Sequence, residues 1–275
     1  MADVSIADIK ALRERTGAGM VDSKNALIEA EGDLEKAIEV LRKKGQSRLA
    51  KREGNATSEG LVAAMEGDGV ATMIELSCET DFVAKGDKFI ALADTVLAAV
   101  HAARATTVED ALAAPAAGGT VADLIAAEAG VINEKMELRR VATLTGDRFS
   151  IYLHKTNQDL PPQIGVVLAY EGEDAEVARS IAQHIAFADP RYITRAEVPE
   201  ADVENERRIV TEISVAEGKP EAALPKIVEG RLGSFFKQSV LLDQDYAKDN
   251  KQSVAQVAKA AGLTLTGFAR FKVGA

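Results

Sequence analysis

The sequence predicts an α+β protein in which a small helical domain precedes a larger core of strands and helices. Apolar residues recur at helical spacing before Gly45, whereas the hydrophobic period changes to two after Gly60. Aromatic residues make up only 4% of a chain that is 47% hydrophobic, so small and aliphatic side chains on closely packed helices must form the core. With 275 residues, the chain is long enough for two or three domains with separate cores.

The N-terminal segment predicts three helices separated by breaks that contain glycine. Ser5 is placed to cap the first helix, and "TGAG" at residues 16–19 ends it. The second helix is expected from about Met20 to Ala30, and Gly45 is the stop signal expected for the third. Together with a polar, basic linker, these helices form a predicted domain over residues 1–54.

Residues 55–140 predict the first subdomain of the core. The stretch "GLVAAMEGDGVATMIEL", residues 60–76, has the alternation of two strands joined by a tight turn. After "ETDFVAK" a helix is expected whose apolar residues share one face: Phe89, Leu92, Ala93, Val96, Leu97 and Val100. A further helix is expected from Thr120 to about Arg140, so that Arg139 and Arg140 would complement the helix dipole at its end.

A similar order of elements recurs in residues 141–275. Strands are expected in "TLTGDRFSIYLH" and "IGVVLAYEG", followed by a helix over residues 174–188. This repetition predicts two duplicated hairpin-plus-helix subdomains. An antiparallel helical hairpin, broken at "EGKP", is inserted at about residues 200–242. The final strand in "LTGFARFKV" is expected to complete the second sheet.

Composition and motifs disfavour several classes of function. Acidic side chains outnumber basic ones by 43 to 33, and the net charge of -10 repels nucleic-acid backbones and anionic membranes. The sequence has no phosphate-binding loop, dinucleotide fingerprint, HExxH or CxxC motif. Its N-terminus lacks the positive charge of a signal peptide, and no apolar run reaches membrane-spanning length. We therefore expect a cytoplasmic protein without a cofactor or a bound metal.

The reactive side chains that occur singly are expected to be structural. His101, His154 and His184 are far apart in sequence, among apolar or helix-forming neighbours. The only cysteine, Cys78, ends an apolar strand, where a buried and inert thiol is expected. The basic cluster within residues 42–52 would suit RNA contact, but no aromatic residues are interleaved to stack bases, which favours a solvated helix end and linker.

The segment Thr80-Asp81-Phe82-Val83 is the main candidate for a functional loop. In one interpretation, Thr80 or Asp81 caps the following helix and Phe82 packs into the core as a hydrophobic staple. In the other, the loop presents the acid and the aromatic ring outward. The ring would then enter a partner's core, while the carboxylate would place negative charge near a phosphate or a metal. The residues alone leave both interpretations open.

Two longer stretches resemble a known family. "LRERTGAGMVDSKNAL" at residues 12–27 and "ELSCETDFVAK" at residues 75–85 closely resemble the signature segments of bacterial translation elongation factor Ts. The likeness continues through "VINEKMELRRVATLTG", "HIAFADPRYI", "EGKPEAALPKIVEGRL" and "LTGFARFKVG" and covers nearly the whole chain. The resemblance implies a UBA-like N-terminal domain. It also implies that the chain is a guanine-nucleotide exchange factor for the GTPase elongation factor Tu and is not itself an enzyme.

The resemblance also implies which residues contact the partner. Thr80, Asp81, Phe82 and Val83 match the loop that intrudes near the magnesium and phosphate site of elongation factor Tu. The other matching positions are partner contacts: Leu12, Arg13, Met20, Val21, Ile132 and His154. Of these, His154 matches a residue that touches the third domain of the partner.

Some positions depart from the family pattern. Ser77 stands where asparagine is usual, and "INEK" at residues 132–135 replaces "IGEN". The loop after His154 is longer than in many members, and the chain ends soon after the last strand. Two other functions stay open: a passive Tu-binding adaptor, and an RNA-binding accessory that uses the basic cluster. We expect no direct nucleic-acid or membrane partner, and for the helical hairpin we favour a peripheral role in self-association or in contact with another partner.

Overall fold

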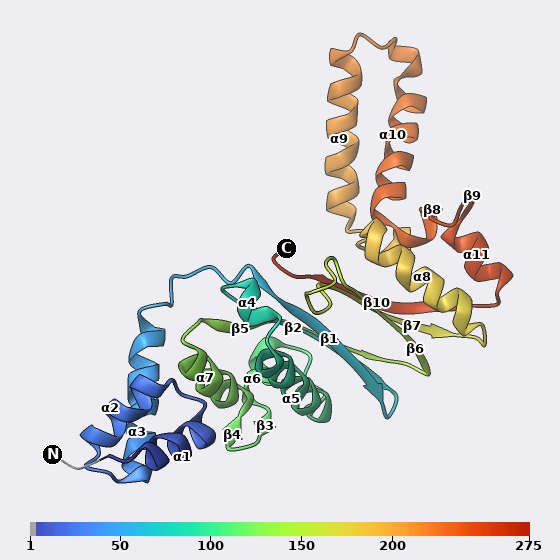
Figure 1. Ribbon diagram of the computed structural model, residues 1–275. Helices are drawn as coiled ribbons and strands as arrows, with labels where there is room; N and C mark the ends of the chain where they lie inside the picture. Colours follow the sequence, from blue (N-terminus) through green and yellow to red (C-terminus); the bar gives the residue numbers. More distant parts are fainter. Residues whose placement is uncertain (1–3) are drawn as a thin grey trace.

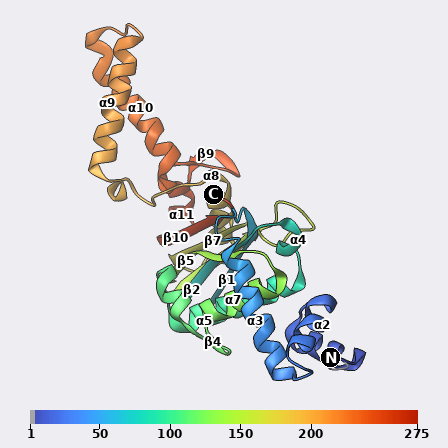
Figure 2. The same ribbon diagram turned by 90° about the vertical axis from the view of Figure 1, so that its left-hand side faces the viewer.

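The computed structural model describes residues 4–275, apart from the side chains of Gln46, Arg48 and Leu49. Residues 1–3 of the predicted N-terminal domain and the Arg48 side chain of the basic cluster therefore lie outside the described part. The N-terminal helices and a long helical hairpin occupy opposite ends of the molecule, with two sheets between them (Figures 1 and 2). Within the described range, no helix is long and apolar enough to cross a membrane.

The three predicted N-terminal helices are present as α1 (Ile6–Thr16), α2 (Met20–Glu29) and α3 (Leu34–Ala50). Ser5 caps α1 through a capping box with Asp8, and Gly17 ends it in the left-handed conformation at φ 70°. The helices enclose a small apolar core made of Ile9, Leu12, Ala26, Leu27, Ala30 and Ala37.

The prediction that Gly45 stops the third helix is wrong, because α3 continues through Gly45 to Ala50. Gly45 lies against Gly130 of α7 (Val121–Ile132), where a β-carbon at position 45 would come within 3.1 Å of the Gly130 Cα. The missing side chain thus permits a close contact between two helices. This contact joins the N-terminal helices to the core.

The first sheet is antiparallel with strand order β1-β2-β5. Its strands are β1 (Glu59–Gly67), β2 (Val70–Cys78) and β5 (Met136–Thr145). The elements between β2 and β5 are α4 (Asp81–Ala84), α5 (Asp87–Ala103), α6 (Val108–Ala113), the small strands β3 (Pro115–Ala116) and β4 (Gly119–Thr120), and α7. These helices cover one face of the sheet (Figure 1) and share a buried apolar cluster with it. The predicted apolar face of α5 is buried there.

The prediction of a helix up to Arg140 is wrong. Helix α7 ends at Ile132, and Asn133 follows in the left-handed conformation at φ 63°, which asparagine tolerates better than most residues. Strand β5 begins at Met136, so Arg139 and Arg140 lie on a strand instead of a helix end. Their side chains bond to Thr57 and to the buried Glu75, respectively.

The second sheet repeats the topology of the first, which confirms the predicted duplication. Its strands are β6 (Arg148–His154), β7 (Ile164–Glu171) and β10 (Thr264–Lys272), in the order β10-β7-β6. In each sheet the last strand pairs antiparallel with the second strand. The helices of this half are α8 (Ala175–Ala188) and α11 (Val254–Ala260), and its short strands are β8 (Asp245–Tyr246) and β9 (Asp249–Ser253). As predicted, the last strand completes this sheet.

The two sheets pack against each other through small and aliphatic side chains. Val62, Ala71 and Met73 of the first sheet share a buried cluster with Val167 and Phe271 of the second. At Gly165 a β-carbon would come within 2.4 Å of a Val62 methyl group, so the glycine allows close approach. The core is therefore continuous between the two halves.

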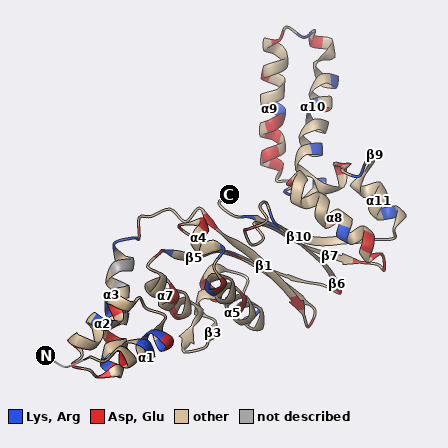
Figure 3. Ribbon diagram, viewed as in Figure 1, with Lys and Arg blue, Asp and Glu red and all other residues tan. Residues whose placement is uncertain are grey.

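The predicted helical hairpin consists of α9 (Glu200–Ala216) and α10 (Leu224–Ser239) and projects from the second half (Figures 1 and 2). Its own buried contacts are made by Val210, Val228 and Leu232. Acidic residues predominate on α9 and basic residues on α10 (Figure 3). Ion pairs cross between the helices, for example Arg207 with Glu229 at 2.6 Å. Short 3-10 helices flank the hairpin at Arg195–Glu197 and Leu241–Asp243, and a third, Glu221–Ala223, lies in its turn.

His184 is a buried structural histidine on α8. Its Nε2 lies 2.9 Å from Gln244 Oε1, and its Nδ1 accepts a hydrogen bond from the Ala247 amide at 3.2 Å. One nitrogen therefore donates and the other accepts, which requires the neutral ring. Burial lowers the pKa of His184 below its ordinary value of 6.5 and outweighs the opposing hydrogen bond to Gln244.

We expect the free energy of unfolding to fall as the pH is lowered below 6.5, because the unfolded His184 then binds a proton that the folded ring resists. Urea denaturation at a series of pH values in the window from about 7.5 to about 5, which spans the ordinary pKa of 6.5, measures this. His184→Gln should reduce the slope in that window. An unchanged slope in His184→Gln would contradict the prediction.

Candidate functional site

The Thr80–Val83 loop forms the start of the one-turn helix α4. The Thr80 hydroxyl caps this helix by accepting a hydrogen bond from the Val83 amide at 3.3 Å. Phe82, in contrast, is 75% exposed, so the interpretation in which its ring packs into the core as a staple is wrong. Half of the Asp81 side chain is exposed beside it, whereas Val83 packs against the first core cluster. The loop presents an acid and an aromatic ring to the surroundings.

Lys85 accompanies this exposed pair and was missed in the sequence analysis. Its Nζ lies 3.4 Å from an Asp81 carboxylate oxygen and 4.4 Å from the centroid of the Phe82 ring. Both contacts are at the surface, where ion pairs and cation–π contacts are weak. The spacing of four residues from Asp81 along a helical turn is the signal that would have indicated it.

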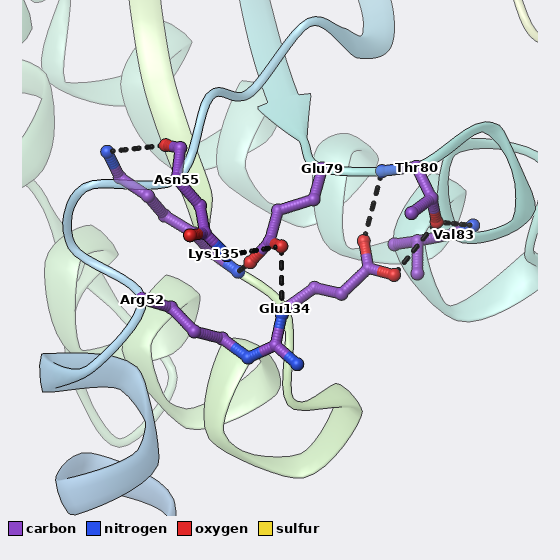
Figure 4. A network of polar contacts seen from close by, with 7 residues as sticks. All are labelled: Arg52, Asn55, Glu79, Thr80, Val83, Glu134 and Lys135. Atoms are coloured by element: carbon purple, nitrogen blue, oxygen red, sulfur yellow. Dashed lines mark hydrogen bonds and ion pairs between the residues drawn. The ribbon is translucent and has the colours of Figure 1, made fainter.

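Two carboxylates hold the base of the loop (Figure 4). Glu134 accepts hydrogen bonds from the Thr80 amide at 3.1 Å and from the Thr80 hydroxyl at 2.8 Å. Glu79 accepts one from the Lys135 amide at 2.6 Å. The second oxygen of Glu79 accepts from Arg52 and from Asn55, each at 2.8 Å. Neither Glu79 nor Glu134 was a predicted site residue.

The pKa of Glu79 reflects these contacts. Partial burial acts to raise it, but the hydrogen bonds from the Lys135 amide, Asn55 and Arg52 outweigh burial and hold the pKa below its ordinary value. Glu79 is therefore ionised at neutral pH, and its hydrogen bonds are charge-assisted.

The "INEK" departure at residues 132–135 has a structural explanation. Asn133 adopts the left-handed conformation that a glycine would adopt without strain. The Lys135 ammonium group lies 2.9 Å from the Glu53 carbonyl oxygen and 2.9 Å from a Glu137 carboxylate oxygen. Lys135 thus connects the start of β5 to the linker that follows α3.

Cys78 and Ser77 lie directly before the loop and are both buried. The Cys78 thiol donates a hydrogen bond to the Thr80 carbonyl oxygen at 3.3 Å. Burial, assisted by the negative charge of Glu134, raises the pKa of Cys78 to about 12, so this thiol is not a nucleophile at neutral pH. Where relatives usually have asparagine, this chain has the Ser77 hydroxyl, which lies 3.4 Å from the Glu75 carboxylate.

The predicted contact residues of the N-terminal helices differ in their exposure. Arg13, Met20 and Val21 are exposed, and 70% of the Val21 surface is accessible. Leu12 is fully buried in the core of the three helices, so its side chain is not available to a partner. Its position in the apolar stripe of α1 explains this, and the assignment as a direct contact is corrected.

The N-terminal helices approach the core close to the Thr80–Val83 loop. A β-carbon at Gly17 would come within 2.6 Å of Lys88 Nζ and 3.2 Å of a Val131 methyl group. Lys88 belongs to α5, which directly follows α4. Ile132, next to Val131, is half-buried against the first core cluster.

His154 lies in the other half of the core, at the end of β6. Its Nδ1 is 3.0 Å from the Tyr152 hydroxyl, and its ring packs edge-on against Phe187 with the centroids 5.4 Å apart. Phe187 is 65% exposed and Leu153 is 37% exposed. These two exposed apolar residues were missed. The signal was an apolar side chain in the last turn of a helix, at "AFADP".

The basic cluster is partly neutralised by ion pairs. Lys44 lies 2.5 Å from Glu29, and Arg52 lies 2.8 Å from Glu79. Arg42 and Lys43 are exposed on α3. In the part of the chain that the structure describes, no group of three or more His, Cys, Asp and Glu side chains is arranged to hold a metal ion.

Comparison with known proteins gives consistent matches along the chain. The family model described as "Elongation factor TS" matches residues 79–275. A relative from Leifsonia xyli subsp. xyli, named "Elongation factor Ts", is 66% identical over 276 residues, which cover 100% of both chains. Relatives of the same name from Clavibacter sepedonicus and Micrococcus luteus are 68% and 56% identical, again with 100% coverage of both chains.

Proposed function

Because this chain belongs to the elongation factor Ts family, and so to the translation elongation factors of protein biosynthesis, we propose that it binds elongation factor Tu and exchanges its GDP for GTP. The observation that supports this most directly is the exposed Phe82 ring beside Asp81, on a loop held at both ends. The exposed ring contributes little burial to the free protein, so its apolar surface is available to a partner. The exchange would take place in the cytoplasm.

Exchange requires no covalent chemistry, only a difference in affinity. If the factor binds nucleotide-free Tu more tightly than the GDP-bound form, GDP must weaken the binding of the factor by the same ratio. A ratio of roughly 100 to 1000 corresponds to about 3 to 4 kcal/mol. Burial of one phenylalanine side chain supplies about 1.5 to 3 kcal/mol of this. Displacement of the bound magnesium by a nearby carboxylate would supply the remainder.

The proposed roles follow the exposure of each residue. Phe82 enters the partner once its nucleotide site opens, and Asp81 disturbs the magnesium and phosphate environment there. Arg13, Met20 and Val21 contact the nucleotide-binding domain, together with Ile132. His154, with the exposed Phe187 ring packed against it, contacts the third domain. Leu12 supports the first helix from inside and makes no direct contact.

Release of a fluorescent GDP analogue from Tu, followed by stopped flow, tests this function. The protein should accelerate release at concentrations far below those of the free nucleotide used as competitor. A passive adaptor would capture Tu in a pull-down without changing the release rate. An RNA-binding accessory would instead retain RNA without Tu, in a manner that weakens steeply with salt.

Deleting the helical hairpin should leave most of the exchange activity. Its apolar contacts are internal to α9 and α10, so residues 203–236 can be replaced by a short Gly/Ser linker without opening the main core. We expect a release rate within about threefold of the full chain, the range typical for losing peripheral contacts. Circular dichroism and thermal unfolding should verify that the remainder is folded. Complete loss of exchange in that folded protein would refute the assignment.

We propose self-association as the other role of the hairpin. Its exposed Ile213 and Val215 offer apolar surface, 44% and 57% exposed, near the free end. Analytical ultracentrifugation of the full chain and of the deletion variant would reveal a dimer that depends on the hairpin. Identical monomeric behaviour of both would exclude this role.

A further inference from the structure

We infer that Glu79 and Glu134 are positioning residues that preorganise the Thr80–Val83 loop for exchange. We call the arrangement of Glu79, Thr80, Glu134 and Lys135 the carboxylate clasp. The inference rests on the proposed function, because the loop that it positions is the proposed exchange loop.

The carboxylate clasp is reciprocal. Glu134 accepts a hydrogen bond from the backbone amide of Thr80, the neighbour of Glu79. Glu79 accepts one from the backbone amide of Lys135, the neighbour of Glu134. The pairing between β2 and β5 ends at Cys78 and Met136, directly before these residues. Where the backbone hydrogen bonds between the strands stop, side-chain carboxylates therefore accept the hydrogen bonds of the next amide groups. They hold the two diverging segments together.

The carboxylate clasp reaches Phe82 through Thr80. The Thr80 hydroxyl donates to Glu134 at 2.8 Å and accepts from the Val83 amide at 3.3 Å, so Glu134 fixes the residue that caps α4. A cap that is held on both sides fixes the direction of the first helical turn. Phe82 lies in that turn but makes few contacts of its own, since three quarters of its surface is exposed. Its orientation therefore depends on the cap.

The carboxylate clasp also connects to the N-terminal helices. Arg52 and Asn55, in the linker after α3, both donate to the second oxygen of Glu79 at 2.8 Å. Lys135 donates to the carbonyl oxygen of Glu53 at 2.9 Å. The linker is thus attached to Glu79 and Lys135, and the exchange loop is attached through Thr80 to Glu134, the chain neighbour of Lys135 in the carboxylate clasp. Two separate contact regions, Met20-Val21 and Phe82, are presented to a partner in a fixed relation, which reduces the ordering required on binding.

Glu134→Ala is the main test, with Glu134→Gln as the conservative variant and Glu66→Ala as the control. Glu66 is an exposed carboxylate on β1 outside the carboxylate clasp. At equal concentrations of factor, Glu134→Ala should slow GDP release from Tu by about tenfold, the loss expected for removing hydrogen bonds to an ionised group. Glu134→Gln keeps one acceptor oxygen and should lose less. Glu66→Ala should match the wild type.

Amide hydrogen exchange of the free protein separates positioning from general stability. In Glu134→Ala, the amides of Thr80 and Val83 should lose protection, whereas the amide of Ile74 in the centre of β2 should keep it. Equal loss at all three amides would indicate a purely structural role and overturn the inference. An unchanged GDP release rate in Glu134→Ala would overturn it as well.

Different results would contradict the proposed function and the role of the carboxylate clasp. If the wild-type protein did not accelerate GDP release, the proposed function would fail. The amide measurement, which needs no partner, would still decide whether the carboxylate clasp holds the loop.

Arg52→Ala tests the contribution of the linker. We expect a two- to threefold loss of exchange rate, because Asn55 and the Lys135 amide still bind Glu79. No loss in Arg52→Ala would remove the linker from the inference.

Discussion

Replacing Phe82 with alanine is expected to slow the release of GDP from elongation factor Tu by at least about tenfold at a given concentration of this protein. The estimate follows from burial, since transfer of a phenylalanine side chain from water into a packed core contributes about 1.5 to 3 kcal/mol, and 1.4 kcal/mol is a factor of ten. Stopped-flow release of a fluorescent GDP analogue measures the effect directly.

The exposure of Phe82 makes this test specific. Because its ring is 75% exposed in the free protein, its removal should not alter the thermal unfolding midpoint. Val215→Ala is a matched control, since Val215 is an apolar residue that is 57% exposed on the hairpin. Phe82→Leu should fall between wild type and alanine. If Phe82→Ala released GDP as fast as the wild type, the activity would have to be sought on another surface.

Local signals in the sequence predicted most of the elements but not their contacts. Ser5 and Gly17 define the ends of α1 through hydrogen bonds within a few residues, so the boundary is visible in the sequence. Gly45 gives the same local signal as Gly17, but glycine is present there for a different reason. Its small size permits the contact with Gly130. A stop and a helix contact both select glycine, and only the fold distinguishes them.

The candidate site was predictable where a side chain acts alone and unpredictable where it acts through a distant partner. The resemblance identified Phe82, and the structure shows that its ring is exposed. The same reasoning named Leu12, although the position of Leu12 in the stripe of α1 places it in the core. Glu134 bonds to Thr80 across 54 positions of the chain, a pairing that becomes visible only when β2 and β5 are side by side.

Glu75 and Arg140 form a partly buried ion pair that connects the two halves of the core. Glu75 is completely buried on β2 and accepts a hydrogen bond from Arg140 of β5. Its other oxygen accepts from the Gly274 amide at 3.3 Å. Arg140 also donates to the Lys272 carbonyl oxygen and lies 4.7 Å from the ring centroid of Phe271, both near the end of β10. The pair therefore joins the first sheet to the last strand of the second.

Arg140→Ala should lower the free energy of unfolding by roughly 3 to 5 kcal/mol, because it leaves the Glu75 carboxylate buried without a countercharge. Urea denaturation at neutral pH measures this loss. Arg148→Ala is the matched control, since the Arg148 pair with Glu173 is exposed and should contribute little.

The double variant Glu75→Leu/Arg140→Met distinguishes the charge from the packing. It removes both ions and keeps apolar volume, so it should be more stable than Arg140→Ala alone, although it has one more substitution. A loss in Arg140→Ala no greater than in Arg148→Ala would show that water reaches Glu75 when its partner is gone. A double variant as unstable as Arg140→Ala would instead assign the effect to the contacts of Arg140 with β10, because the buried charge would then be absent and the loss would persist.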